Sequence, residues 1–282
     1  MYPPAFYGYF EFRSEEIAME ERAWQGVIYM PIAGRLDKPR ALGWTMVIDK
    51  GLSLTETENL LSVAADYIDV IKLAFGTSAL YRRSLLEDKI RLIQGFGVGV
   101  MPGGTLGEIA LCQGSWPAYL DQAARFGFDF LEISDGTIPL DGENRRAAIM
   151  TAREKGFSVI SEVGKKHPED QQPLEKEMHQ ALLDLACEAR MVIIEGRESG
   201  KGIGIYDAQG GICDAGLNRL AGGLPMEKVI WEAPLKPQQE TMILRYGPNV
   251  NLGNIPPGDV LALEALRLGL RGDTLRMAMK SS

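Results

Sequence analysis

Short apolar runs rich in valine and isoleucine alternate with longer amphipathic stretches along most of this chain, beginning near residue 40. This alternation is typical of βα units in a parallel sheet, whose strands are covered on both faces and read as nearly continuous apolar runs. Eight such units in 282 residues favour a closed (β/α)8 barrel, which needs roughly 250 residues, over an open doubly wound sheet. The predicted strands are Thr45–Ile48, Asp69–Phe75, Phe96–Met101, Phe128–Ile133, Ser158–Val163, Met191–Glu195, Val229–Glu232 and Met242–Tyr246.

The stretches between these runs carry helix signals. Ser53 and Glu56 have the spacing of a capping box, in which each side chain accepts the backbone N–H of the other. Leu61, Ala64 and Ile68 then recur on one face of the following helix, and residues 173–190 show similar helical spacing. The prediction is therefore an α/β protein with a single (β/α)8 TIM barrel.

Residues 1–38 show no clear period and are predicted to form a short N-terminal extension, which leaves 39–282 for the barrel domain. The extension begins with a dense group of aromatic residues: Tyr2, Phe6, Tyr7, Tyr9, Phe10 and Phe12. Aromatic side chains at this density are more often used for packing than for chemistry. We expect them to pack on the barrel or on a neighbouring subunit, and hence expect a homo-oligomer.

The net charge of −8 argues against a nucleic-acid partner, which would require clustered lysine and arginine. Small anionic substrates need only a local positive pocket. The three cysteines, Cys112, Cys187 and Cys213, are too far apart for a zinc motif and odd in number, so reduced thiols are expected. The chain shows neither a signal peptide nor an apolar run of roughly 20 residues, which predicts a cytoplasmic protein without membrane association.

Many of the predicted strands are interrupted near their C-terminal end by one ionisable residue. These residues are Lys72, Glu132, Glu162, Glu195, Glu232 and Arg245. Burying an unpaired charge costs several kcal/mol, so such residues must pair with one another, bind a metal or bind a charged ligand. Strand alternation places Glu132 on the same face as Phe130 and Ser134, and catalysis in these barrels occurs at the C-terminal ends of the strands. The ring predicts an active site, with buried ion pairs such as Lys72 with Glu132 as the alternative.

Two glycine-rich loops extend this prediction. The loop from Gly196 to Gly204 superficially resembles a phosphate-binding P-loop, but its spacing is one residue short and Gly202 replaces the required Ser or Thr. It is interpreted as an active-site loop without nucleotide specificity. The segment from Gly247 to Asn254 is expected to follow the eighth strand, where barrels often bind phosphate through backbone donors.

Six short motifs lie in order near the predicted strand ends. They are Lys38–Arg40 with Thr45–Gly51, Ile71–Ser78, Gly103–Leu106, Leu131–Gly136, Ser161–Lys166 and Glu195–Glu198. Together they resemble the phosphosulfolactate synthase family, over the chain from about residue 38 to the glycine-rich loop that begins at Gly247. The resemblance implies a (β/α)8 barrel and a magnesium-dependent addition of sulfite to phosphoenolpyruvate, giving (2R)-2-phospho-3-sulfolactate. In archaea this step begins coenzyme M synthesis, and in some bacteria it leads to sulfolactate.

The implied chemistry assigns roles to the ring. Glu132, Glu162 and Glu195 are the candidate ligands of Mg²⁺, which would stabilise the charge that develops as sulfite attacks. Lys165 is the candidate proton donor, with Lys166 lowering its pKa. Lys72, Arg197 and Arg245 are expected to bind the anionic substrates. The catalytic candidates are Lys165, Lys72 and Arg197, and the substrate-binding candidates are Lys50, Asp135, Lys166, Glu232, Arg245, Asn249, Asn251 and Gly253.

Two other functions fit the same residues. One is a different magnesium-dependent barrel enzyme that acts on phosphoenolpyruvate or a related enolate, which differs only in the nucleophile. The other is a non-catalytic, stress-associated member of the family, because the family also includes plant heat-stress-associated proteins. A scaffold has no use for so many charges at strand ends, which favours an enzyme.

Overall fold

The structure is a computed structural model that describes residues 22–280. The chain divides into two compact units, residues 1–30 and 31–282. In the first unit, the described residues form a turn at 23–27, and the aromatic residues of the predicted extension lie outside the described part. Residues 31–38 belong to the second unit, where Arg35 Nε lies 2.8 Å from Glu264 Oε1.

Eight parallel strands of the second unit form one sheet in the order β3-β2-β1-β8-β7-β6-β5-β4. The strands are β1 (Thr45–Asp49), β2 (Val70–Leu73), β3 (Gly99–Pro102), β4 (Phe130–Ile133), β5 (Ser158–Val163), β6 (Met191–Ile194), β7 (Val229–Glu232) and β8 (Asn251–Ile255). Because β1 pairs with both β2 and β8, the sheet curls into a nearly closed barrel. At the seam between β3 and β4, Asp129 N donates to Val100 O (3.1 Å) and Val100 N donates to Asp129 Oδ2 (3.0 Å).

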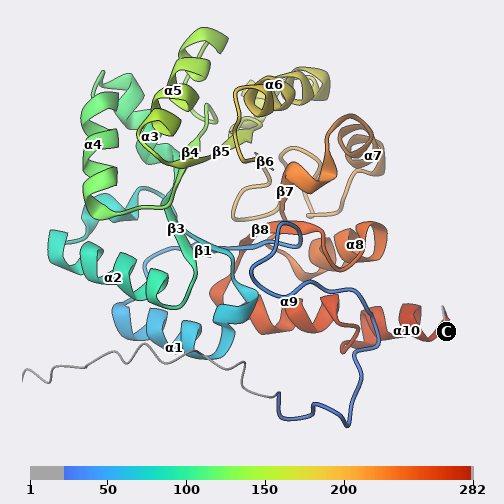
Figure 1. Cartoon of the computed structure of the whole chain (residues 1–282). Coiled ribbons are helices and arrows are strands. Elements are labelled where there is room, and N and C mark those ends of the chain that lie inside the picture. The colour runs from blue at the N-terminus through green and yellow to red at the C-terminus, as the bar shows by residue number, and fades with distance from the viewer. Residues whose placement is uncertain (1–21, 281–282) are drawn as a thin grey trace, which may run out of the picture. The chain divides into compact units, whose positions relative to one another are not determined.

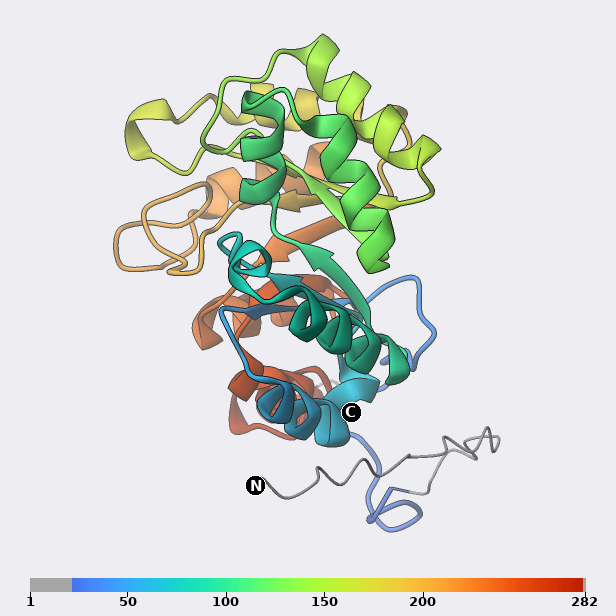
Figure 2. The ribbon, with the colours of Figure 1, turned by 90° about the vertical axis from the view of Figure 1, so that its left-hand side faces the viewer.

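Helices surround this barrel, and Figure 1 shows them outside the strands. They are α1 (Leu54–Ala64), α2 (Arg83–Gly95), α3 (Gly104–Cys112), α4 (Trp116–Phe126), α5 (Gly142–Glu154), α6 (Leu174–Ala186), α7 (Asp214–Gly223), α8 (Lys236–Tyr246), α9 (Val260–Arg267) and α10 (Gly272–Lys280). Figure 2 shows α2 and α4 covering the side of the sheet that faces the viewer. The predicted (β/α)8 barrel is confirmed, as is the capping box of Ser53 and Glu56 at the start of α1. Within residues 22–280, every helix is too short or too polar to cross a bilayer.

Seven of the predicted strands coincide with β1–β7 to within a few residues, but the eighth prediction is wrong. Met242–Tyr246 is the last turn and a half of helix α8, and the last strand is Asn251–Ile255. The error has a physical reason: Met242 and Ile243 are fully buried against the sheet, and a short apolar run does not distinguish a buried helix from a strand. The strand β8 was missed because its sequence, Asn-Leu-Gly-Asn-Ile, contains three residues of low β-propensity.

The barrel interior follows the predicted alternation. Inward-facing Met46, Val70, Ile160 and Ile230 form a core cluster of their own, separate from the larger one between strands and helices. At the end where the strands begin, Trp44 packs edge-on against Phe130 with ring centroids 5.8 Å apart. Apolar side chains therefore fill the lower barrel, and the inward positions further along each strand carry the charges.

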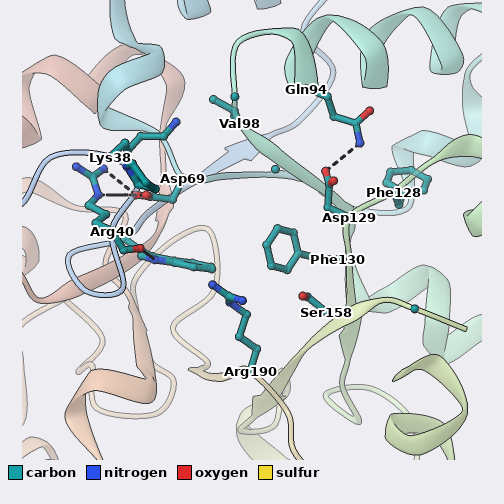
Figure 3. Close-up of a pocket in the computed structure, with 15 residues that line it drawn as sticks. Lys38, Arg40, Asp69, Gln94, Val98, Phe128, Asp129, Phe130, Ser158 and Arg190 are labelled. Carbon is teal, nitrogen blue, oxygen red and sulfur yellow. Dashed lines mark hydrogen bonds and ion pairs between the residues drawn. The ribbon is translucent and has the colours of Figure 1, made fainter. Parts of the chain in front are cut away.

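A hollow of about 630 Å³ lies at the end where the strands begin. Figure 3 shows two of its acidic residues paired with neighbouring side chains: Arg40 reaches Asp69 (2.8 Å) and Gln94 reaches Asp129 (3.1 Å). Lys38 Nζ donates to the carbonyl oxygens of Ala65 and Ile68. These side chains join loops to strands, which is a structural use, and in barrels of this type the bottom face serves stability.

A buried ion pair links helices α5 and α6. The Arg145 side chain is 1% exposed, donates to both oxygens of Asp184, and also donates to the carbonyl oxygen of Glu162 (2.8 Å). This hydrogen bond to Glu162 O connects helix α5 to strand β5, which carries the Glu162 carboxylate at the barrel mouth.

We expect Asp184→Ala to lower the free energy of unfolding by about 3 kcal/mol, because it leaves the buried Arg145 partly unpaired. The matched control is Arg153→Gln on helix α5, the helix that carries Arg145; it breaks the exposed ion pair of Arg153 with Glu188 and should cost less than about 1 kcal/mol. Urea denaturation of the three proteins tests this, and equal losses for the two variants would contradict it.

Candidate active site

The C-terminal ends of the strands enclose a pocket of about 200 Å³. Lys72 enters it from β2, Glu132 from β4, Glu162 from β5 and Glu232 from β7, because each occupies an inward position near the end of its strand. Glu195, Lys166 and Arg197 enter from the loops that follow β5 and β6. The structure therefore brings together seven of the residues that the sequence predicted for the site.

Lys72 is the central cation of the pocket. Its Nζ lies 3.0 Å from Glu232 Oε1, 3.2 Å from Glu132 Oε2 and 3.6 Å from Glu162 Oε2. Burial alone would lower the pKa of Lys72, but the three carboxylates outweigh this and raise it well above its ordinary value. Lys72 is therefore a permanent cation that holds three strands' carboxylates together.

The carboxylates of Glu162, Glu195 and Glu232 form a cluster in which one oxygen of each lies within 4.8 Å of the others. Glu162 Oε1 and Glu195 Oε2 are buried and accept no hydrogen bond from any described residue; the Lys166 ammonium lies 3.5 and 4.0 Å from them. Buried carboxylate oxygens of this kind are the ligands that Mg²⁺ prefers. The set of carboxylate oxygens therefore fits a divalent cation. The predicted ligands were Glu132, Glu162 and Glu195, and in this cluster Glu232 replaces Glu132.

The pKa values of the carboxylates diverge. Burial, together with Glu162, raises the pKa of Glu132 to about 7. Burial and the neighbouring Glu162 and Glu232 raise the pKa of Glu195 well above its ordinary value. Burial opposes ionisation of Glu162 too, but Lys166 and Lys72 hold its pKa well below the ordinary value. The pocket thus has more carboxylates than its cations can neutralise, and either protons or a metal ion must balance the excess.

Lys166 and Arg197 are the cations closest to solvent in the pocket. Lys166 Nζ lies 3.5 Å from Glu162 Oε1 and 4.0 Å from Glu195 Oε2, beyond normal hydrogen-bond length. Glu162 raises its pKa, outweighing partial burial. Arg197 has a left-handed backbone (φ 62°), donates its N–H to Glu195 Oε1 (2.6 Å), and donates from Nη1 to Lys166 O (3.2 Å).

Lys165 lies outside this pocket, although it neighbours Lys166 in the sequence. Its Nζ is 2.6 Å from Asp135 Oδ2, and both residues line a separate hollow beside helix α6. Asp135 also accepts from the buried Arg145 (2.9 Å). Lys50 is exposed, and its Nζ lies 6.0 Å from the ring centroid of Phe75 at the rim. The structure therefore places these three predicted residues near the mouth but not in its pocket.

Four predicted substrate-binding residues lie elsewhere because the eighth strand was misplaced. Arg245 is on helix α8 and pairs with Asp214. Asn249 precedes β8 and accepts from Leu36 N (3.0 Å), and Asn251 begins β8 and accepts from Trp44 N (2.9 Å), at the opposite end of the barrel. Gly253 is inside β8, where an added Cβ would approach Met46 and Ile230. The prediction that Arg245 follows Leu244 on a strand toward the mouth is wrong.

Three residues in or beside the pocket were given no individual role in the sequence analysis. Glu108 of α3 accepts from Ser134 Oγ (2.6 Å) and Gly136 N (3.0 Å), which shapes the loop after β4. Gly104 N donates to Glu132 Oε1 (2.9 Å), and a Cβ at Gly104 would lie only 2.3 Å from that oxygen. Asn254 at the end of β8 lines the pocket. A glutamate within the otherwise apolar stretch of α3 was the one signal that sequence inspection could have used.

We expect the stability of the metal-free protein to fall as pH rises from about 4.5 to about 7. Over this interval the folded Glu132 carboxyl keeps a proton that the unfolded chain, with its ordinary value of 4.5, has released. Glu132→Gln removes this titration, so the free energy of unfolding of the variant should gain on the parent between pH 5 and pH 8. Urea denaturation across this range measures the difference, and a difference that does not change with pH would contradict the assignment.

Comparisons with known proteins find relatives that cover most of this chain. The (2R)-phospho-3-sulfolactate synthase (ComA) family matches residues 33–273. A phosphosulfolactate synthase from Methanothermobacter thermautotrophicus is 46% identical over 243 residues, covering 86% of this chain and 94% of that protein. One from Methanocaldococcus jannaschii is 45% identical over 234 residues, covering 82% and 93%.

Among solved structures, 3-hexulose-6-phosphate synthase from Salmonella typhimurium is similar with a TM-score of 0.54 at 14% identity, covering 81% of this chain and all of that one. At this identity the likeness concerns the barrel fold alone. The family match spans every residue of the pocket, from Ile48 to Asn254. The chain belongs to the phosphosulfolactate synthase family.

Proposed function

We propose that this protein catalyses the Mg²⁺-dependent addition of sulfite to phosphoenolpyruvate, giving (2R)-2-phospho-3-sulfolactate. The observation that carries the proposal is the composition of the mouth pocket: three carboxylates clustered within 4.8 Å, with Lys166 and Arg197 beside them. The names of the relatives support the same reaction. Sulfite is itself the nucleophile, so the reaction needs no Ser-His or Cys-His pair.

Glu162, Glu195 and Glu232 are the proposed Mg²⁺ ligands, because their buried oxygens include two without a hydrogen-bond donor. A bound Mg²⁺ would act as a Lewis acid that stabilises negative charge on the substrate carboxylate. Lys72 keeps Glu162 and Glu232 in place through its contacts of 3.6 and 3.0 Å. We therefore propose that Lys72 positions the metal ligands. This role differs from the direct contact with substrate that the sequence predicted for it.

Lys166 is the proposed proton donor, in place of Lys165. The sulfur lone pair of sulfite forms the bond to C3, the C2–C3 π electrons move to C2 and the carboxylate, and the Lys166 ammonium gives its proton to C2. The raised pKa keeps Lys166 protonated until the substrates are bound, and solvent then restores its proton. The position of Lys165, whose ammonium is paired with Asp135 outside the pocket, favours Lys166 for this role.

Arg197 and Lys166 also account for the attraction of two anions to an acidic protein. Both lie on loops above the carboxylates, and neither is enclosed by carboxylates as Lys72 is. The planar guanidinium of arginine can bind an oxyanion through two parallel hydrogen bonds. Sulfite and the substrate carboxylate are the groups that we place against these two cations.

Incubation of the purified protein with phosphoenolpyruvate, Mg²⁺ and sulfite should yield phosphosulfolactate, detected by mass spectrometry. Removal of divalent cations with EDTA should abolish the product, and Mg²⁺ should restore it. Folded protein that forms no product at saturating substrate would refute the proposal. Binding of phosphoenolpyruvate without product would then favour another enolate enzyme, and no binding in calorimetry would favour the non-catalytic alternative.

Lys166→Ala should lower kcat about 10²- to 10⁴-fold, the usual contribution of a positioned acid. The matched control is the adjacent Lys165→Ala, which should retain most of the turnover because its ammonium lies outside the pocket. Lys166→Arg should keep the affinity for phosphoenolpyruvate but not kcat, since arginine does not release its proton. A larger loss of kcat in Lys165→Ala than in Lys166→Ala would return the role to Lys165.

A further inference from the structure

Phe75 is a large aromatic residue that stands exposed at the wall of the mouth pocket. It follows β2, lines the pocket and is 54% exposed, although the preceding Ala74 is buried. A single exposed apolar side chain on a protein surface needs no explanation. At the wall of a substrate pocket it has a use, because ligand pockets are lined largely by apolar and aromatic side chains that contact the ligand.

The backbone of Phe75 is strained. Its φ is 56°, in the left-handed region, which is an outlier for a bulky side chain. Leu73 packs between the sheet and the helices, and Ala74 lines the pocket, so regular alternation would turn Phe75 back toward the helices. The left-handed conformation breaks this alternation, and two successive residues line the pocket. Strained conformations of this kind cluster at active sites and ligand clamps.

Hydrogen bonds around Phe75 hold this conformation. Ala74 N donates to Asp49 O (2.9 Å) at the end of β1, and Thr77 N and Oγ1 donate to Ala74 O (3.0 and 2.8 Å). Asp49 is itself fully buried, and the Lys89 ammonium lies 2.6 Å from its Oδ2. A strained residue persists only where its surroundings over-determine it. The end of β1 and the turn after β2 therefore fix Phe75 at the pocket.

The wall that contains Phe75 differs in chemistry from the rest of the pocket. Lys166, Arg197 and the five glutamates of the pocket belong to β4 to β7 and the segments that follow these strands. The residues that β1 to β3 and their following segments contribute are Lys72, which three glutamates surround, and the uncharged Ile48, Ala74, Phe75, Gly103, Gly104 and Thr105. The apolar side chains of Ile48, Ala74 and Phe75 offer no hydrogen bond to a charged group, so the uncharged part of a ligand is the part that fits against them.

Phosphoenolpyruvate has one uncharged end. Its carboxylate and phosphate groups are anionic, and only the methylene group at C3 is apolar. We infer that Phe75 packs against this methylene group and so restricts the pocket to enol phosphates without a substituent at C3. The inference rests on the proposed function for the identity of the substrate. Sulfite attacks C3 from one face of the planar double bond, so a contact between Phe75 and the edge of the methylene group leaves that path open.

The test compares phosphoenolpyruvate with its 3-methyl analogue, phosphoenolbutyrate, in the parent protein and in Phe75→Ala. The measured quantity is kcat/KM for phosphoenolpyruvate divided by kcat/KM for the analogue, with sulfite as the second substrate. Differences in the intrinsic reactivity of the two enol phosphates cancel when this ratio is compared between proteins. Phe75→Ala should lower the ratio about 10- to 200-fold, the usual range for one methylene group in an apolar pocket.

Phe75→Gly is a second variant, because glycine adopts a positive φ without strain and removes the same ring. It should lower the ratio by a similar factor. The matched control is Phe96→Ala, which removes another exposed aromatic ring (38% exposed) at the end of α2, away from the residues that line the pocket. Its ratio should equal that of the parent, and thermal unfolding of all variants identifies any loss that comes from the fold.

An unchanged ratio in both Phe75 variants would overturn the inference, and so would an equal fall in Phe96→Ala. A loss of turnover that is the same for both substrates would also overturn it, because Phe75 would then only shape the pocket. Calorimetric titration with Mg²⁺ and either enol phosphate, without sulfite, keeps this test separate from the proposed reaction. If the parent prefers phosphoenolpyruvate in binding but forms no phosphosulfolactate, only the proposed reaction fails, and a weaker preference in Phe75→Ala still supports the contact. A parent that binds both enol phosphates equally, or neither, would overturn the inference.

Discussion

The mouth of this barrel depends on one buried lysine that faces three glutamates. Lys72 lies within 3.6 Å of carboxylates from β4, β5 and β7, so one cation on β2 is linked to the far side of the barrel. Carboxylates this close would repel one another strongly without it. A buried cluster of this kind contributes little net stability, and its value lies in holding buried oxygen ligands at set positions.

The cluster also sets the chemistry, because its charges do not balance. Glu195 and Glu132 have raised pKa values in the absence of a metal, which means that the pocket takes up protons when no other cation is present. A divalent cation relieves the same excess. The loops after β5 and β6 add Lys166 and Arg197 above the carboxylates, so one small pocket combines ligands for a cation with binding groups for anions.

Much of this could be read from the sequence, and the failures have local causes. Phe130 and Glu132 were placed on the inner face correctly, because strand alternation is a rigid geometric rule. Lys165 and Lys166 could not be told apart, since adjacent loop residues point in directions that only the loop conformation decides. Arg245 was misplaced because its apolar neighbours pack one face of a helix, and Asn254 was assigned to a loop because the strand that contains it has residues of low β-propensity.

By itself, the sequence determined the barrel, its first seven strands and the set of strand-end charges, because hydrophobic periodicity and the cost of burying charge act over a few neighbouring residues. Only the tertiary structure decided which charges meet. Lys72 and Glu232 are 160 positions apart in the chain but 3.0 Å apart in space, and such a distance depends on how the whole sheet closes. The choice of Lys166 over Lys165, and the place of Asn254 in the pocket wall, follow from the same closure.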